Sequence, residues 1–90
     1  MLLLPAELTH DQATACCRML AEALRRDAGT AIVADAAPLQ RFDSSALAVL
    51  LECRREALAA GKSFSVARMP PRLRELAMVY GVAELLPAAP

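Results

Sequence analysis

The 90-residue chain has no tryptophan, one histidine and balanced charge, with ten basic and ten acidic residues. A neutral chain offers no basic surface to nucleic acid and no polybasic patch to anionic lipid. The three cysteines, Cys16, Cys17 and Cys53, are odd in number and form no C-x-x-C pair. With His10 as the one histidine, they predict neither a disulfide framework nor a zinc site, and they fit buried thiols in a reducing compartment.

The chain also lacks a long uninterrupted apolar segment. Its first apolar run, Met1–Leu4, stops at Pro5, which is too short for a signal-peptide core or a membrane span. We therefore expect a cytosolic protein with no direct membrane insertion. Hydrophobic residues nevertheless make up 57% of the sequence, although residues 1–90 have room for a single small domain. This surplus indicates that a partner covers part of the apolar surface.

Strand and helix patterns alternate along the chain. Short apolar runs at residues 2–4 and 30–34 predict strands, and so does the alternation of polar and apolar residues at 63–67. Helical periodicity predicts helices at residues 10–26, from Asp43 to about 60, and from Pro70 to Tyr80. Thr9 and Gln12 have the spacing of a capping box at the start of the first helix. The expected apolar face of the last helix consists of Leu73, Leu76, Ala77 and Tyr80. Glycines at 29, 61 and 81 follow these helices as stops, and a tail anchored by Leu85 or Leu86 closes the chain. Strands joined by helices through short links predict an α/β fold with crossover connections.

The helix after Asp43 carries more apolar residues than one buried face needs. One stripe is expected to face the sheet and consists of Ala46, Val49, Leu50, Cys53, Ala57 and Ala60. A second stripe, about 120° around the helix, consists of Leu47, Leu51 and Leu58, with Arg54 between them. The second stripe has two interpretations: it packs against a neighbouring helix, or it is offered to another protein.

Asp43, Ser44 and Ser45 stand where a loop turns into this apolar helix. Asp43 is suited to be the N-cap, because its carboxylate can accept the first free backbone N–H groups. Ser44 then lies in the first turn, where the helix dipole and free N–H groups favour an added phosphate. By itself, such a cluster is more often only a helix cap.

These residues resemble the signature of the STAS domain family, in which a strand ending in aspartate precedes Asp-Ser/Thr-x-Gly-Leu and an apolar helix. The matching segments here are Ile32–Asp35 and Asp43–Leu47. Weaker similarity covers the family's other segments, at Leu3–Leu8, Gly61–Val66 and Leu73–Val82. The resemblance implies a mixed sheet of about four strands with helices packed on it.

Two departures from the family pattern stand out. Ala46 replaces the family's glycine, so a residue with a side chain must make the turn into the helix. Only Met1–Leu4 precede the Glu7-Leu8 segment, so we expect the family's first strand to be absent or supplied by a second copy. An exposed edge strand would result, and such an edge can pair with a second copy to form a homodimer.

Two branches of the family fit this domain. The first is the MlaB-type subunit of a phospholipid ABC transporter, which binds the cytosolic ATPase (MlaF-like), supports its assembly and activity, and sits peripherally at the inner membrane. The second is the anti-sigma factor antagonist, in which an anti-sigma kinase would phosphorylate Ser44. The ending around Tyr80 and Pro87 resembles the MlaB type. The implied partner-binding residues are Ser44, Ser45, Leu47, Leu51, Pro71 and Arg72.

An enzyme is the third class, and the sequence does not favour it. His10 lies by the first helix and is expected to be far from Ser44, so no nucleophile–base pair is predicted. Asp35 and Asp43 form a pair of carboxylates that turn formation and capping explain better. No glycine-rich phosphate loop is present. We expect no cofactor and no metal, and a mechanism of surface complementarity.

Overall fold

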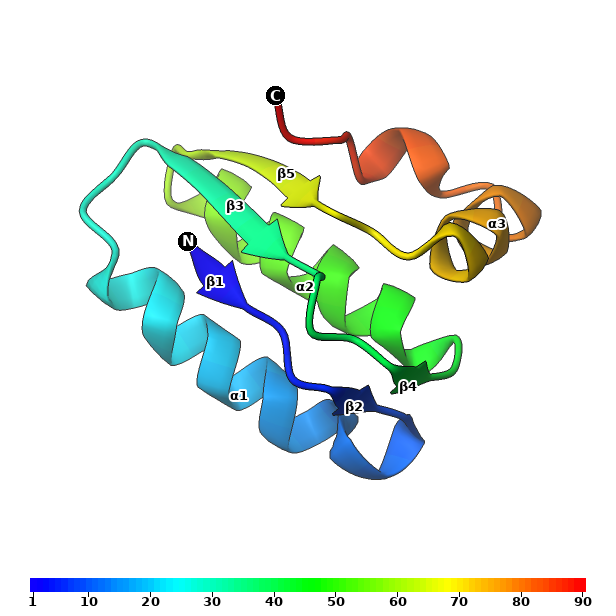
Figure 1. The fold of residues 1–90 in the computed structure, drawn as a ribbon. Coiled ribbons are helices and arrows are strands. Elements are labelled where there is room, and N and C mark those ends of the chain that lie inside the picture. The colour runs from blue at the N-terminus through cyan, green and yellow to red at the C-terminus, as the bar shows by residue number, and fades with distance from the viewer.

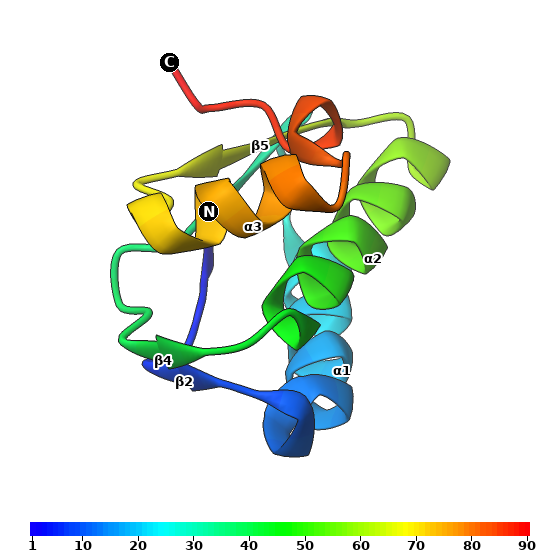
Figure 2. The same ribbon diagram turned by 90° about the vertical axis from the view of Figure 1, so that its right-hand side faces the viewer.

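The computed structural model describes all residues, 1–90. Helices α1 (His10–Arg26) and α2 (Ser45–Ala59) lie side by side on one face of the strands, as Figures 1 and 2 show. Helix α3 (Pro71–Val79) and the short 3-10 helix η1 (Ala83–Leu85) follow the last strand and contact each other. None of these helices combines the length and apolarity that crossing a bilayer requires.

Three parallel strands form the main sheet in the order β1–β3–β5. They are β1 (Leu2–Leu3), β3 (Ala31–Asp35) and β5 (Ser63–Ala67). A second parallel pair consists of β2 (Glu7–Leu8) and β4 (Arg41–Phe42). Parallel neighbours need crossover connections, and α1 and α2 supply them.

The predicted α/β class is confirmed, and one detail of the sheet differs. All strand pairings are parallel, and five short strands divide into two sheets, where about four strands in one mixed sheet had been expected. Strand β1 is an edge strand, as expected, while pairing of two copies through it stays a prediction. The tail covers the outer side of β5, because Val66 N–H donates to the Pro87 carbonyl at 2.8 Å and Ala89 N–H donates to the Val66 carbonyl at 2.9 Å.

The hydrophobic core lies between the sheet and the helices. Ile32 and Ala34 of β3 are fully covered, as are Leu50 of α2 and, almost entirely, Leu20 of α1. The predicted sheet-facing stripe of α2 is buried as far as Ala57. Ala60 is exposed, because α2 has already ended. The core therefore includes the first stripe of α2 and also Leu47 of the second stripe.

Caps and glycines fix the ends of the helices. The Thr9 N–H donates to Gln12 Oε1 at 2.8 Å, which is half of the predicted capping box. Gly61 and Gly81 follow α2 and α3 in the left-handed region, with φ of 74° and 72°. Val82 N–H then donates to the Ala77 carbonyl at 2.9 Å, as a Schellman stop requires. The turn at Gly81 sends the chain back over α2.

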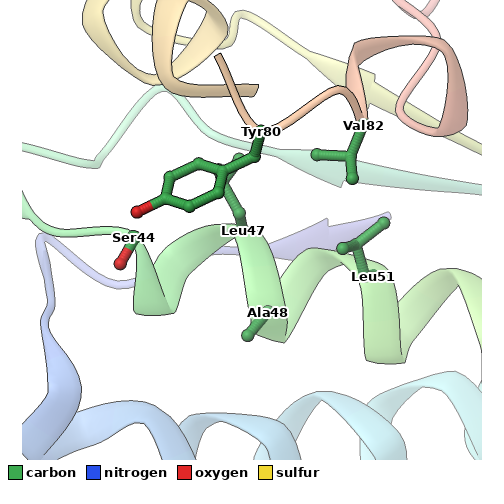
Figure 3. Close-up of a pocket in the computed structure, with 6 residues that line it drawn as sticks. All are labelled: Ser44, Leu47, Ala48, Leu51, Tyr80 and Val82. Carbon is green, nitrogen blue, oxygen red and sulfur yellow. The ribbon is translucent and has the colours of Figure 1, made fainter. Parts of the chain in front are cut away.

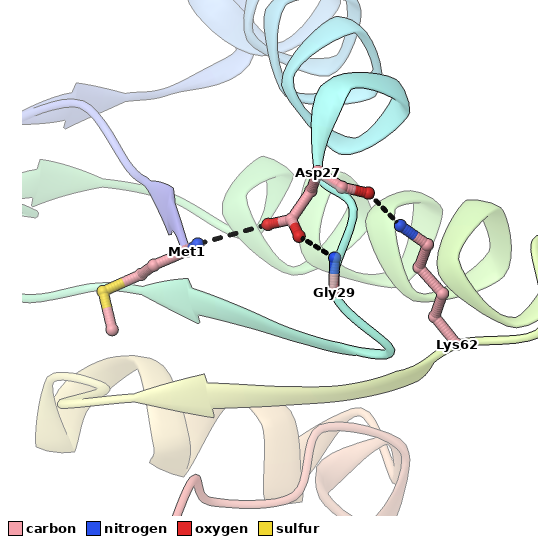
Figure 4. Close-up of polar contacts among 4 residues, drawn as sticks. All are labelled: Met1, Asp27, Gly29 and Lys62. Carbon is pink, nitrogen blue, oxygen red and sulfur yellow. Dashed lines mark hydrogen bonds and ion pairs between the residues drawn. The ribbon is translucent and has the colours of Figure 1, made fainter.

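Helix α1 ends at Arg26, before Gly29, which the sequence had suggested as its stop. Asp27 leaves the helical conformation at φ −81° and ψ 119°. Its carboxylate accepts the Gly29 N–H at 2.8 Å and pairs with the Met1 ammonium at 3.3 Å (Figure 4). Its carbonyl accepts a hydrogen bond from Lys62 Nζ. Asp27 therefore ties the end of α1 to the starts of β1 and β5.

Candidate functional site

The start of α2 is held by the carboxylate of Asp43. Its Oδ1 accepts the Ser45 N–H at 2.8 Å, and its Oδ2 accepts the His10 N–H at 3.1 Å. These two bonds join the first turns of α1 and α2. They also lower the pKa of Asp43 below its ordinary value, with the Ser45 N–H as the larger cause and the His10 N–H next. The carboxylate is therefore ionised at neutral pH, and both of its oxygens accept hydrogen bonds from backbone N–H groups.

Ser44 is exposed and is itself the N-cap residue of α2, so it precedes the first turn in which the sequence had placed it. Its hydroxyl forms no hydrogen bond with the rest of the chain. Ser45, the next residue, is partly buried. The backbone makes the turn into α2 with helical angles at Ser44, φ −61° and ψ −17°, so Ala46 stands here without the strain that would demand glycine. A free hydroxyl is thus presented to solvent from a fixed backbone position.

An apolar groove begins at Ser44 and runs along α2. It encloses about 280 Å³ and is bounded on one side by α2 and on the other by the residues that follow α3. Its lining residues are Ser44, Leu47, Ala48, Leu51, Tyr80 and Val82. Figure 3 shows the Tyr80 ring lying over Leu47, with its hydroxyl directed toward Ser44. The groove therefore combines an apolar floor with two hydroxyl groups at one end.

Exposed apolar side chains lie on the elements that surround this groove. Tyr80 is 60% exposed, and its neighbours Met78 and Val79 at the end of α3 are 66% and 81% exposed. Leu85 of η1 and Leu58 of α2 are also exposed. Five of the eight large hydrophobic residues that the structure exposes thus lie on the elements around the groove. Apolar exposure is thus concentrated on these elements, although Met78 and Val79 line separate hollows of the surface.

The structure brings only some of the predicted partner-binding residues together. Ser44 and Leu51 line the groove, and Leu51 is half-buried. Leu47 also lines it but is only 3% exposed, so it supports the floor and offers little contact area. Pro71 and Arg72 are exposed and lie outside the groove, at the start of α3. The second stripe of α2 is therefore shared between internal packing and the surface.

Arg72 has a contact of its own that places it near the loop before α2. Its guanidinium carbon lies 5.4 Å from the centre of the Phe42 ring. Phe42 is the last residue of β4 and stands two residues before Ser44. The start of α3 therefore approaches the Ser44 end of the groove without lining it.

Three groove residues were not predicted: Ala48, Tyr80 and Val82. The sequence placed Tyr80 on the apolar face of its helix with Leu73 and Ala77, and this was wrong for Tyr80, since those two residues are buried and Tyr80 is exposed. Tyr80 follows the last residue of α3 and immediately precedes Gly81. Tyr80 keeps helical backbone angles and its N–H still donates to the Leu76 carbonyl at 3.0 Å, so it is exposed because the helix ends there, beyond the buried core. Its position immediately before Gly81 was the available signal.

Other polar groups of the chain are engaged elsewhere. Asp35, at the end of β3, is 3% exposed and forms an ion pair with Arg68. Hydrogen bonds from the Arg68 side chain and from the Ala37 N–H hold the pKa of Asp35 below its ordinary value. Burial raises the pKa of Cys16 to about 11 and that of Cys53 to about 12, so both thiols stay protonated. No three His, Cys, Asp or Glu side chains are grouped to hold a metal ion.

Comparisons with known proteins agree with this geometry. A family model described as "Mlab, STAS domain" matches residues 1–87. Among solved structures, the anti-sigma factor antagonist SpoIIAA in its unphosphorylated form is similar, with a TM-score of 0.73 and 23% sequence identity. That match covers 98% of this chain and 76% of the other, and at this identity it shows the fold alone. Among curated proteins, none matches the chain significantly.

Proposed function

The chain belongs to the STAS domain family, as the match over residues 1–87 shows, and we propose that it is the MlaB-type accessory subunit of a phospholipid ABC transporter. In this role it binds the cytosolic ATPase subunit and supports its assembly and activity. The chain itself carries out no reaction and is held at the inner membrane through its partner. The description of the matching family supports this branch.

The apolar groove that begins at Ser44 is the observation that carries the proposal. Its floor is formed by Leu47 and Leu51, and the exposed ring of Tyr80 forms one wall. Such a groove suits an apolar side chain of a protein partner, while the Ser44 and Tyr80 hydroxyls can orient the partner's polar groups. Surface complementarity of this kind needs no catalytic group.

Binding can support the ATPase only if the chain has a different affinity for the assembled and the unassembled forms of the ATPase. If the chain prefers the assembled form of the ATPase, mass action shifts the population toward that form. The Asp43 bonds to Ser45 and His10 make the docking face rigid before binding. A preformed face loses little conformational entropy on association, which favours such a role.

Affinity capture from native cells tests the proposal. We expect a tagged chain to co-purify with the ATPase of a phospholipid ABC transporter, and we expect Ser44→Asp to lose that ATPase. The control is Thr14→Asp, which adds a charge of the same sign at an exposed residue of α1 and should leave capture of the ATPase unchanged. Normal recovery of the ATPase with Ser44→Asp would contradict docking at this groove.

A second candidate function is favoured by the free hydroxyl of Ser44. In an anti-sigma factor antagonist, a kinase would transfer the γ-phosphate of ATP to this oxygen. Ser44 is exposed and its hydroxyl has no partner in the chain, so a kinase could reach it. Incubation with a cognate anti-sigma kinase and ATP should then add the mass of one phosphate, and Ser44→Ala should prevent the addition. An unchanged mass of the wild-type chain would exclude this branch.

A further inference from the structure

Arg54 lies beyond the Leu51 end of the groove and has no partner within the chain. Its Cα is about 4.5 Å further along the axis of α2 than that of Leu51, and its direction from the axis is within about 20° of that of Leu47. The residue is half-buried. No ion pair, side-chain hydrogen bond or aromatic contact involves its guanidinium, whereas the adjacent Arg55 pairs with Glu52 at 3.5 Å.

Docking at the groove would remove water from this guanidinium. The exposed Leu58 lies one turn further along α2, so a partner that covers both the groove and Leu58 must also cover Arg54. A cation that loses its water without gaining an acceptor opposes binding strongly. The acids nearest in sequence, Glu52 and Glu56, each lie two residues from Arg54, about 160° around α2, and no carboxylate of the chain forms an ion pair with Arg54. The acceptor must therefore come from the partner.

From this geometry we infer that the docking surface of the ATPase carries an aspartate or glutamate that pairs with Arg54, next to an apolar side chain that fills the groove. The inference rests on the proposed function and names the chemistry of the partner's surface. A carboxylate suits the site better than a neutral carbonyl, because it neutralises the charge and accepts two parallel N–H bonds from the planar guanidinium. Arg54 is thus a specificity-determining residue of the interface.

The test compares the affinity of Arg54→Glu and Arg54→Gln for the purified ATPase subunit with that of the wild-type chain. We expect charge reversal to weaken binding at least tenfold and the neutral variant to weaken it less. The matched control is Arg18→Glu on α1, where the arginine is exposed and, like Arg54, without an ion pair, and its affinity should not change. Thermal unfolding should be unaltered in all variants, because Arg54 makes no bond that holds the fold.

A charge exchange then identifies the partner residue. Single Asp→Arg or Glu→Arg variants on the ATPase surface are titrated with Arg54→Glu, and we expect one of them to restore binding at least fivefold. If Arg54→Glu binds the ATPase within threefold of the wild-type chain, the inference is wrong while the proposed function stands. If the wild-type chain itself does not bind the ATPase, the proposed function fails, and the inference fails with it.

Discussion

Replacing Tyr80 with alanine should weaken ATPase binding about 100-fold. A tyrosine can bury roughly 200 Å², and Tyr80 is 60% exposed, which leaves roughly 120 Å² for a partner to cover. At about 25 cal/mol per Å² this area is worth about 3 kcal/mol. Since about 1.4 kcal/mol corresponds to a factor of ten, the expected loss is about two orders of magnitude.

The same substitution also has a smaller effect on folding. The covered part of Tyr80 lies over Leu47 (Figure 3), and its loss should cost at most about 2 kcal/mol of unfolding free energy at the same coefficient. Binding must therefore be measured well below the unfolding midpoint of the variant. Isothermal titration with the purified ATPase gives the affinity, and circular dichroism on the same sample shows that the variant is folded.

Two control variants separate the contributions. Tyr80→Phe keeps the ring and removes the hydroxyl, so its affinity should fall less than tenfold. Met19 of α1 is 50% exposed and lies away from the groove, so Met19→Ala should bind normally. A folded Tyr80→Ala that binds within threefold of the wild-type chain would refute the assignment of this groove as the docking site.

Three further predictions concern the same fold. Ser44→Asp should weaken ATPase binding at least tenfold in the same titration, because an unpaired charge is buried, whereas Ser44→Ala should bind almost normally; equal affinities would contradict this. Leu50 is fully covered, so replacing it with alanine should lower the free energy of unfolding by about 2–5 kcal/mol, measured by urea unfolding. A loss below about 1 kcal/mol would contradict the packing of Leu50. Arg68 is the main cause of the lowered pKa of Asp35. The ionised Asp35 should therefore stabilise the fold above about pH 4, and this stability should disappear as the pH falls through the folded-state pKa. An unfolding temperature that is unchanged between pH 7 and pH 3 would contradict this contribution of Asp35.

The sequence predicted the elements well where local signals determine them. Helix α1 has the predicted bounds, His10–Arg26, because an apolar stripe and the Thr9 and Gln12 cap act within a few residues of each other. Gly61 and Gly81 end their helices as predicted, since both adopt a left-handed conformation. Gly29 does not, because the Asp27 carboxylate turns the chain first.

The groove could not be predicted in the same way, since it depends on contacts between distant segments. Its α2 wall was visible in the sequence as the second apolar stripe. Its other wall exists because the turn at Gly81 sets Tyr80 and Val82 over α2. Periodicity placed Tyr80 on the apolar face of its helix, and it could not show that Tyr80 would be exposed, or that Leu47 would be covered while Leu58 stays exposed.

The position of Asp43 explains why such a surface can recognise a partner by shape. One carboxylate accepts N–H groups from Ser45 and His10, so the starts of α1 and α2 cannot move apart without breaking a hydrogen bond to a charged group. Ser44 projects from this fixed point, and Tyr80 reaches toward it from the far end of α3 (Figure 3). A change that loosens the cap would displace Ser44 relative to Tyr80 without altering either side chain. Asp43→Ala should therefore weaken ATPase binding through the geometry of the groove, although Asp43 lines none of it.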